Sequence, residues 1–386
     1  MKPANQVMDG LGTTVFEVMS RLAIEHGSIN LGQGFPDEDG PEDVRRAAAD
    51  ALMAGPNQYP PMAGLPELRQ AIAAHAARFY GLDVDWQREV LVTSGATEAL
   101  ADCFFGLLNP GDEVILLEPL YDSYPPIVAR AGAVPRYVRL EPPDWTLPKA
   151  ALEEAFGPKT KAILLNTPMN PASKVFSAEE LSAIAELCVR HDVVAICDEV
   201  YEHLVFDGAD HLPLINLPGM RERTLRIGSA GKIFSLTGWK VGWVVGAPEL
   251  LAPIMKTHQF MTFTTPPDLQ KAVAYGLAKD DGYFSDLAGD MQAKRDRLSA
   301  GLARAGFDVL PSGGTYFVSA DFRPLGFNGT DEEFCRLITL EAGVTAVPVS
   351  AFYRTGEVHH LARFCFSKQD DILDEASDRL AKRFAA

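Results

Sequence analysis

Residues 161–197 read KAILLNTPMNPASKVFSAEELSAIAELCVRHDVVAIC, and they set the architecture of the whole chain. The two ends of this stretch, KAILL and VVAIC, are short apolar runs of the kind that form buried strands. Between them, Ser177 and Glu180 have the spacing of a helix capping box. Apolar residues then recur at helical spacing as far as Cys188. The stretch therefore predicts a strand, a helix and a second strand, the repeating unit of a parallel sheet covered by helices.

The same alternation continues on both sides of this unit. A helical pattern over residues 97–108 ends at the chain breaker Asn-Pro-Gly. We therefore expect an α/β fold in which helices sandwich a mostly parallel sheet, with ligands bound at the carboxyl ends of its strands. Further buried strands are expected at residues 89–93 (EVLVT), 113–117 (EVILL), 224–227 (TLRI) and 241–245 (VGWVV).

Two segments flank the region that forms this sheet. They are residues 1–40 and residues 280–386, and the second has its own mixture of helical and strand patterns. We expect residues 41–279 to form a large domain that contains this sheet and its ligand site. A smaller α/β domain is expected to form where the two flanking segments pack together.

Composition limits the functions that are open to the chain. Its 386 residues are enough for two domains, and 35 basic against 52 acidic residues give a formal charge of −17. This balance argues against nucleic-acid binding, which requires a basic face. No apolar stretch approaches the ~18 residues of a membrane helix, and residues 1–10 lack the pattern of a signal peptide. We expect a cytoplasmic protein without a membrane anchor, whose five cysteines are buried, reduced and free of metal.

The densest chemical signal is the segment SAGKIFSLTGWKVG at residues 229–242, which carries two lysines eight positions apart. An isolated lysine near a strand end is usually solvated surface. Here the surrounding glycines and hydroxyl groups indicate a close approach of the backbone to a ligand. Lys232 could attack a carbonyl group if burial or a cationic neighbour lowered its pKa. Lys240, Ser229 and Ser235 could then hold a phosphate.

This segment resembles the Schiff-base signature of the fold-type I pyridoxal-phosphate aminotransferases. The resemblance extends from about residue 10 to residue 380 and includes NLGQGFPD and RFCF. It is greatest to the kynurenine and glutamine-phenylpyruvate aminotransferases and to bacterial methionine aminotransferases. The resemblance implies pyridoxal 5'-phosphate as the cofactor, carried covalently on the amine of Lys232. It also implies that Ser229 and Lys240 bind the phosphate.

The residues that follow the buried run VVAIC supply the expected partners of the pyridine ring. A carboxylate is costly to bury there without a partner, although a helix cap or a salt bridge would also satisfy it. The resemblance implies that Asp198 keeps the ring nitrogen protonated and that Tyr201 hydrogen-bonds the ring hydroxyl. Glu199 is expected to point to the opposite face, because neighbouring side chains of an extended segment alternate.

The remaining cofactor contacts come from two further segments. In SGATEAL, residues 94–100, a strand leads through a small-residue turn into a helix, which is a typical anion site. Ala96 and Thr97 are expected to hold the phosphate there. The resemblance places Tyr121 against the face of the pyridine ring, although an isolated aromatic residue is more often part of a core.

Three residues are expected to hold the substrate. Arg363 lies in an otherwise apolar, strand-like run and needs a partner, which the resemblance identifies as the α-carboxylate of the amino acid. A structural salt bridge is the alternative. The resemblance also places the backbone N–H of Gly34 at this carboxylate, and Asn170 at both the carboxylate and the ring hydroxyl. Ser173 stands where the family commonly has glycine.

The expected side-chain pocket departs from the pattern of the eukaryotic relatives. Phe16 stands where a tryptophan is found, and Thr264, which follows Phe263, stands where a histidine is common. Kynurenine is therefore in doubt as the natural amino donor. Tyr59 matches a tyrosine that reaches the cofactor of the neighbouring subunit, so the resemblance implies a homodimer.

The sequence thus predicts a pyridoxal-phosphate aminotransferase that moves the amino group of an L-amino acid to a 2-oxo acid by a ping-pong mechanism. A neutral, aromatic or sulfur-containing amino acid is the expected donor, and Lys232 the general base. A carbon–sulfur β-lyase acting on cysteine conjugates or cystathionine needs the same residues and stays open as an alternative. A non-catalytic effector-binding module would carry a basic helix-turn-helix extension, which is absent from this sequence.

Overall fold

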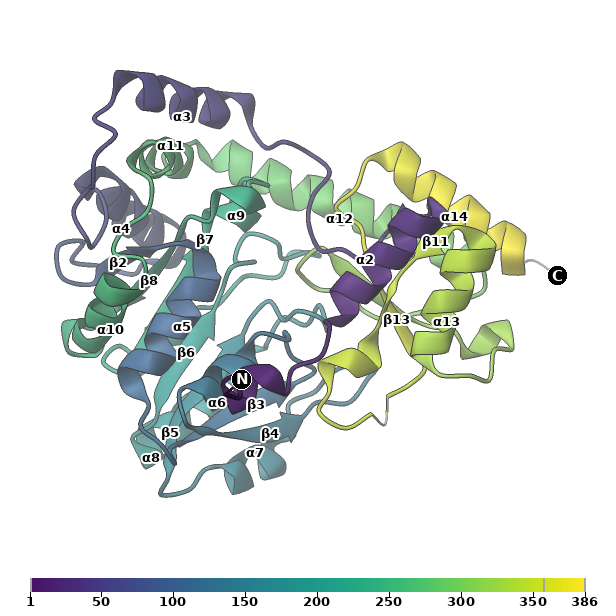
Figure 1. The fold of residues 1–386 in the computed structure, drawn as a ribbon, viewed down its shortest axis with the longest axis horizontal. Coiled ribbons are helices and arrows are strands. Elements are labelled where there is room, and N and C mark those ends of the chain that lie inside the picture. Colours follow the sequence, from purple (N-terminus) through teal and green to yellow (C-terminus); the bar gives the residue numbers. More distant parts are fainter. Residues whose placement is uncertain (1, 357, 385–386) are drawn as a thin grey trace.

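The computed structural model describes residues 2–356 and 358–384 and is built around a seven-stranded sheet (Figure 1). The order across this sheet is β2-β8-β7-β6-β5-β3-β4. Only β8 runs antiparallel to its neighbours; the other pairings are parallel. The strands are β2 (Val90–Thr93), β3 (Glu113–Glu118), β4 (Val134–Arg139), β5 (Thr160–Asn166), β6 (Val194–Asp198), β7 (Thr224–Ser229) and β8 (Gly242–Gly246).

Helices cover both faces of this sheet, as its apolar strands require. Ile196 of β6 packs with residues of α5, α6 and α10, whereas its neighbours Ala195 and Cys197 pack with α8 on the opposite face. The helices are α1 (Gln6–Asp9), α2 (Val15–His26), α3 (Glu42–Ala54), α4 (Pro66–Tyr80), α5 (Gly95–Leu107), α6 (Tyr124–Arg130), α7 (Lys149–Ala155), α8 (Ala178–His191), α9 (Ala230–Ile233), α10 (Pro248–Met261), α11 (Pro267–Leu277), α12 (Asp281–Arg304), α13 (Asp331–Leu337) and α14 (Asp370–Phe384).

The predicted α/β fold class is confirmed, and the six expected strands are all present within one or two residues of their predicted bounds. The capping box of Ser177 and Glu180 also forms, at the start of α8. The sequence did not predict β4, the edge strand opposite β2. Its first four residues alternate between exposed and partly buried, and Pro135 and Arg136 hide the β pattern. This is typical of an edge strand, where a polar side chain costs little.

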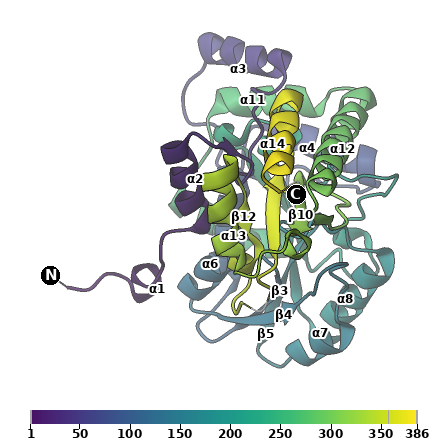
Figure 2. The ribbon, with the colours of Figure 1, turned by 90° about the vertical axis from the view of Figure 1, so that its right-hand side faces the viewer.

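The two flanking segments meet in space. Strand β1 (Ile29–Asn30) pairs with β11 (Val344–Thr345), and α2 lies beside α13 and α14 in both views (Figures 1 and 2). A four-stranded antiparallel sheet, in the order β12-β13-β10-β9, lies in the same region. The domain boundaries at residues 40 and 280 stay a prediction. The strands of the small sheet are β9 (Asp308–Val309), β10 (Phe317–Asp321), β12 (Val347–Pro348) and β13 (Leu361–Cys365).

Two simpler expectations can be compared with the structure directly. All five cysteines are buried and unpaired. In the part of the chain that the structure describes, none of the helices has the length and apolar character that crossing a bilayer demands.

Candidate active site

A cavity of about 530 Å³ opens at the carboxyl ends of the parallel strands. Asn166, Asp198 and Ser229 are the last residues of β5, β6 and β7, and all three line it. Its position is the one that an open α/β sheet favours for ligands. The residues that the sequence singled out and that line this cavity are Phe16, Gly34, Ala96, Thr97, Tyr121, Asn170, Asp198, Tyr201, Ser229, Lys232, Lys240 and Arg363.

Lys232 lies on α9, a single turn that follows β7 directly. Its side chain is half-buried, and its amine donates a hydrogen bond of 2.6 Å to the hydroxyl oxygen of Tyr316. Burial lowers the pKa of the Lys232 amine to about 8, although the nearby carboxylate of Asp198 opposes this shift. A solvated surface lysine does not have these properties. An amine with this pKa is partly neutral near pH 7 to 8 and can act as a nucleophile or base.

Asp198 is 5% exposed, and both of its carboxylate oxygens accept from neutral donors. Oδ2 accepts from the hydroxyl of Tyr124 at 2.7 Å, and Oδ1 accepts from the backbone N–H of Val200 at 3.4 Å. Burial raises the pKa of the Asp198 carboxyl group. A buried carboxylate beside a cavity, bonded only to neutral donors, fits a cationic ligand group.

Glu199 points away from the cavity, as the alternation of side chains predicts. Its Oε2 lies 2.6 Å from Arg226 Nε and 2.9 Å from His211 Nε2 on the other side of the strand. Glu199 is therefore part of a buried ion pair, and Asp198 is the carboxylate that the cavity exposes.

Arg363 lies on β13 and is fully buried. Its Nη1 donates to the amide oxygen of Asn170 at 2.8 Å, and its Nη2 donates to the carbonyl oxygen of Gly32 at 3.0 Å. Its Nε has no hydrogen-bond partner among the described residues, and burial lowers the pKa of the guanidinium group to about 10. Neither of these partners is a carboxylate, so these contacts do not form the structural salt bridge that was the alternative for Arg363. The unsatisfied guanidinium fits a carboxylate of a ligand.

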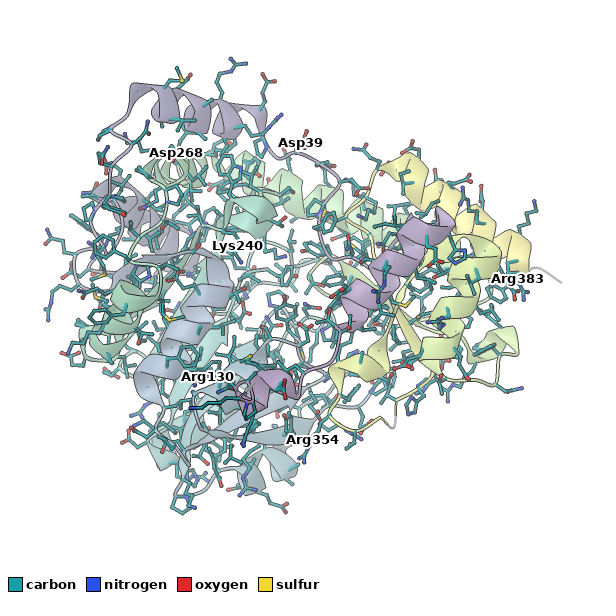
Figure 3. All side chains as sticks on the ribbon, viewed as in Figure 1. Asp39, Arg130, Lys240, Asp268, Arg354 and Arg383 are labelled. Carbon is teal, nitrogen blue, oxygen red and sulfur yellow. The ribbon has the colours of Figure 1, made fainter. Side chains whose placement is uncertain are left out.

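A second positive region lies where β2 runs into α5. The first turn of α5 has no side-chain cap at Ser94, so its N–H groups are available to an anion. Lys240 adjoins this turn (Figure 3): a Cβ atom on Gly95 would lie 3.2 Å from Lys240 Nζ. A Cβ on Gly242 would lie 2.7 Å from the backbone carbon of Gly95, so both glycines are needed for this close approach. The arrangement fits a phosphate monoester.

Four predicted residues do not line the cavity of this chain: Ser235, and the group of Tyr59, Phe263 and Thr264. Tyr59 is 83% exposed and stacks edge-to-face on Phe263 at a centroid distance of 5.6 Å. Thr264 follows Phe263 in the same loop, and none of the three is among the described residues that surround the cavity. Their predicted contacts with a cofactor or substrate would require a second chain.

Other residues of the site were missed from the sequence. Tyr124 lies only three residues after Tyr121 and could have been found from that spacing. Tyr316 offered no such signal, because its run Thr-Tyr-Phe has the composition of an ordinary buried strand. Asp122, Phe35 and Phe317 also line the cavity.

Together these groups fit pyridoxal phosphate: an amine for its aldehyde, a carboxylate for its ring nitrogen and a cationic helix terminus for its phosphate. The site therefore defines the class of a pyridoxal-phosphate enzyme. Residues 27–380 match the model of aminotransferase class I and II, and the chain belongs to this family.

Two relatives and one solved structure show how similar the chain is to other members. The probable N-succinyldiaminopimelate aminotransferase DapC of Mycobacterium tuberculosis is 50% identical over 380 residues, which cover 96% of each chain. The methionine aminotransferase of Escherichia coli is 39% identical over 374 residues, again 96% of each chain. The structure of the Mycobacterium tuberculosis N-succinyldiaminopimelate aminotransferase has a TM-score of 0.96 at 49% identity, over 98% of this chain and 100% of that one. The chain is a pyridoxal-phosphate-dependent aminotransferase, and the predicted family, enzyme class and cofactor are confirmed.

Proposed function

We propose that this aminotransferase takes its amino group from a neutral L-amino acid with an apolar, aromatic or sulfur-containing side chain. Phe16, Phe35 and Phe317 line the cavity and favour such a side chain. Lys232, Lys240 and Arg363 are the cations that line the cavity in the described part of the chain. The first two are needed by the cofactor, so Arg363 alone is left for the substrate's α-carboxylate.

The cofactor would be held at three points. Asp198 would face its ring nitrogen, Tyr201 and Asn170 would face its ring hydroxyl, and Tyr121 would lie against the ring. Ala96 and Thr97 at the start of α5, together with Ser229 and Lys240, would bind its phosphate. When bound, pyridoxal phosphate supplies an electron sink that stabilises negative charge at the α-carbon of the amino acid.

The residues of this chain then bind the substrate and move its proton. Arg363 forms a bidentate pair with the α-carboxylate, and Asn170 and the N–H of Gly34 complete its binding. The amine of Lys232, when free and neutral, takes the proton from the α-carbon on Nζ and delivers it to a second position within hydrogen-bond reach. The single observation that carries this proposal is that Lys232, Asp198 and Arg363 face one cavity and form no ion pair with any residue that the structure describes.

We also propose that the enzyme is a cytoplasmic homodimer. The N-terminal segment that carries α1 stands away from the body of the chain and exposes Met8 and Leu11 (Figure 2). Tyr59, Phe260 and Phe263 are exposed aromatic residues. A partner subunit that covered these groups would bring Tyr59, Phe263 and Thr264 to its own cavity. Sedimentation equilibrium of the purified enzyme tests the dimer.

Lys232→Ala tests the proposed function directly. We expect the variant to fold but to lose the absorbance band of the covalently bound cofactor and at least about 10⁴-fold in kcat, because it lacks both the attachment point and the base. Lys149→Ala is the matched control, since Lys149 forms only an exposed ion pair with Glu179 and should behave as wild type. Near-normal turnover of Lys232→Ala would overturn the assignment.

A substrate panel tests the donor class. Methionine, phenylalanine, kynurenine, N-succinyl-diaminopimelate and glutamate would each be assayed with pyruvate and with 2-oxoglutarate as acceptors. We expect parallel-line ping-pong kinetics and the highest kcat/KM for methionine or phenylalanine. A clear preference for N-succinyl-diaminopimelate would contradict the proposed donor class. Release of pyruvate and ammonia from cystathionine without an acceptor would indicate the β-lyase instead.

A further inference from the structure

The hydroxyl group of Tyr316 lies between the amine of Lys232 and the backbone of the loop that is expected to hold the substrate. Lys232 Nζ is 2.6 Å from the Tyr316 hydroxyl oxygen, which is itself 2.5 Å from the carbonyl oxygen of Gly34. Tyr316 is 1% exposed and directly precedes β10. One hydroxyl group therefore connects α9, the start of β10 and the Gly34 loop.

The direction of both hydrogen bonds is fixed by chemistry. A carbonyl oxygen can only accept, so the single proton of the Tyr316 hydroxyl is donated to Gly34. The hydroxyl oxygen has only lone pairs left for Lys232, and the lysine must donate one of its N–H groups. A neutral amine held in this way keeps its own lone pair free. If the tyrosine donated to the amine instead, that lone pair would be occupied and the base would be blocked.

Several hydrogen bonds fix the backbone on both sides of Tyr316. Thr315 has a φ of 68°, a left-handed conformation that is unfavourable for a β-branched residue. Its N–H donates to the carbonyl oxygen of Leu204 at 2.9 Å. Ser173 Oγ lies 3.1 Å from Thr315 Oγ1 and donates to the carbonyl oxygen of Phe317 at 2.7 Å. Ser173 thus fastens both neighbours of Tyr316.

We propose that Tyr316 is a positioning residue that holds one N–H of the free Lys232 amine, leaves the lone pair of Nζ open to the substrate, and fixes this geometry relative to the Gly34 loop. The proposal rests on the proposed role of Lys232 as the base. Tyr201, Asp198, Lys240, Arg363 and Cys365 are the other titratable or charged groups near Lys232 and Tyr316. None of them hydrogen-bonds the amine within the described part of the chain.

Tyr316→Phe tests the proposal in the holoenzyme with its cofactor in the amino form, because Lys232 is then free. Trace acetylation at a series of pH values, read by mass spectrometry of the Lys232 peptide, gives the pKa and the reactivity of this amine. We expect its pKa to fall by on the order of one unit, because an acceptor that favours the charged amine is lost. We expect kcat to fall about 10- to 100-fold through misplacement of the base, with a much smaller change in KM.

Tyr283→Phe is the matched control, because its hydroxyl donates to the carbonyl oxygen of Ile233, beside Lys232, without contacting the amine. It should leave the pKa of Lys232 and kcat at their wild-type values. A Tyr316→Phe variant that loads cofactor but keeps the wild-type lysine pKa and kcat would overturn the proposal. A variant that has a lower free energy of unfolding but an unchanged lysine pKa and kcat would also overturn the proposal.

A second variant covers the case in which Tyr316→Phe does not fold. 3-Fluorotyrosine at position 316 keeps the shape and both hydrogen bonds but is a weaker acceptor. We expect a smaller decrease of the lysine pKa in the same direction, and no decrease would overturn the proposal. If even the wild-type protein fails to bind pyridoxal phosphate at Lys232, the proposed function fails, and this result is distinct from a failure of the Tyr316 proposal.

Discussion

Two buried arginines of this chain have opposite surroundings. Arg226, on β7, bonds Glu199 through Nε at 2.6 Å and Glu202 through Nη2, and these two carboxylates raise the pKa of its guanidinium group above the usual value against the effect of burial. Arg363, on β13, bonds only neutral oxygens among residues 2–356 and 358–384, and burial lowers the pKa of its guanidinium group to about 10. Both side chains are at most 1% exposed.

The same contrast separates two consecutive residues of one strand end. Asp198 faces the cavity and has only neutral donors, whereas Glu199 faces Arg226 and His211. Burying a charge without a partner is costly, and a fold gains nothing from it unless a ligand supplies the opposite charge. The charges of Arg226 and Glu199 therefore stabilise the fold. Those of Arg363 and Asp198 are available to a substrate and a cofactor.

The largest expected effect comes from replacing Asp198 and Glu199 in two separate variants. Asp198→Asn should lower kcat by on the order of 10³-fold, because the charge that faces the cofactor ring is lost where negative charge develops. Its free energy of unfolding without cofactor should be unchanged or higher, since a buried charge is removed. Glu199→Gln should do the opposite, with a lower free energy of unfolding and nearly normal kcat in the folded fraction. Urea unfolding and steady-state kinetics of both variants check this, and equal losses of kcat would remove the distinction.

The two arginines provide the next test. Arg226→Met should lower the free energy of unfolding by about 3–5 kcal/mol, because Glu199 and Glu202 are left buried without their counter-ion. Arg363→Met makes the same change in a site without a partner. It should leave the free energy of unfolding of the apo protein unchanged or raise it, and should lower kcat/KM by on the order of 10²-fold through loss of the carboxylate contact. A large destabilisation by Arg363→Met would show that its charge is structural after all.

The sequence could reveal much of this contrast, but not all of it. Asp198 and Arg363 interrupt apolar runs, so each already needs a partner, and Glu199 follows from the alternation of side chains. The partners themselves could not be assigned: Arg226 looked like part of an ordinary strand, and Arg363 meets an asparagine 193 positions away.

Two kinds of feature lay beyond the reach of local patterns. The Tyr316 hydrogen bond to Gly34 spans 282 positions and is invisible in a local pattern. The edge strand β4 tolerates polar residues, which hides it. Tyr59 and Phe263 lie outside the cavity of their own chain. Their predicted contacts therefore depend on a second subunit, which the pattern of one sequence does not describe.

Arg226, Glu199, Glu202 and His211 form a buried ionic group, which we call the Arg226 cluster. The smallest expected effect concerns the two histidines beside this cluster. His75 Nε2 and His203 Nε2 lie 2.8 Å apart, and burial lowers their pKa values to about 4 and about 3. An unfolded histidine has a pKa near 6.5, so between pH 6.5 and about 4 the unfolded chain binds more protons than the folded one. Stability must then fall as the pH falls through this window, by about 1 kcal/mol per pH unit for each histidine. His75→Gln keeps a polar partner for His203 but removes one of these protonations.

The variant should therefore lose less of its free energy of unfolding than wild type when urea unfolding is compared at pH 7 and pH 5. The many carboxylates contribute equally to both proteins and cancel in the difference. His26→Gln, at an exposed helix end, should retain the wild-type dependence. An equal pH dependence in His75→Gln and wild type would mean that the histidine pair already carries a proton in the folded state. The two carboxylates, Glu199 and Glu202, would then be balanced by two cations, Arg226 and the protonated histidine pair. This charge balance would distinguish the cluster even more clearly from Asp198 and Arg363, which have no charged partner among the described residues.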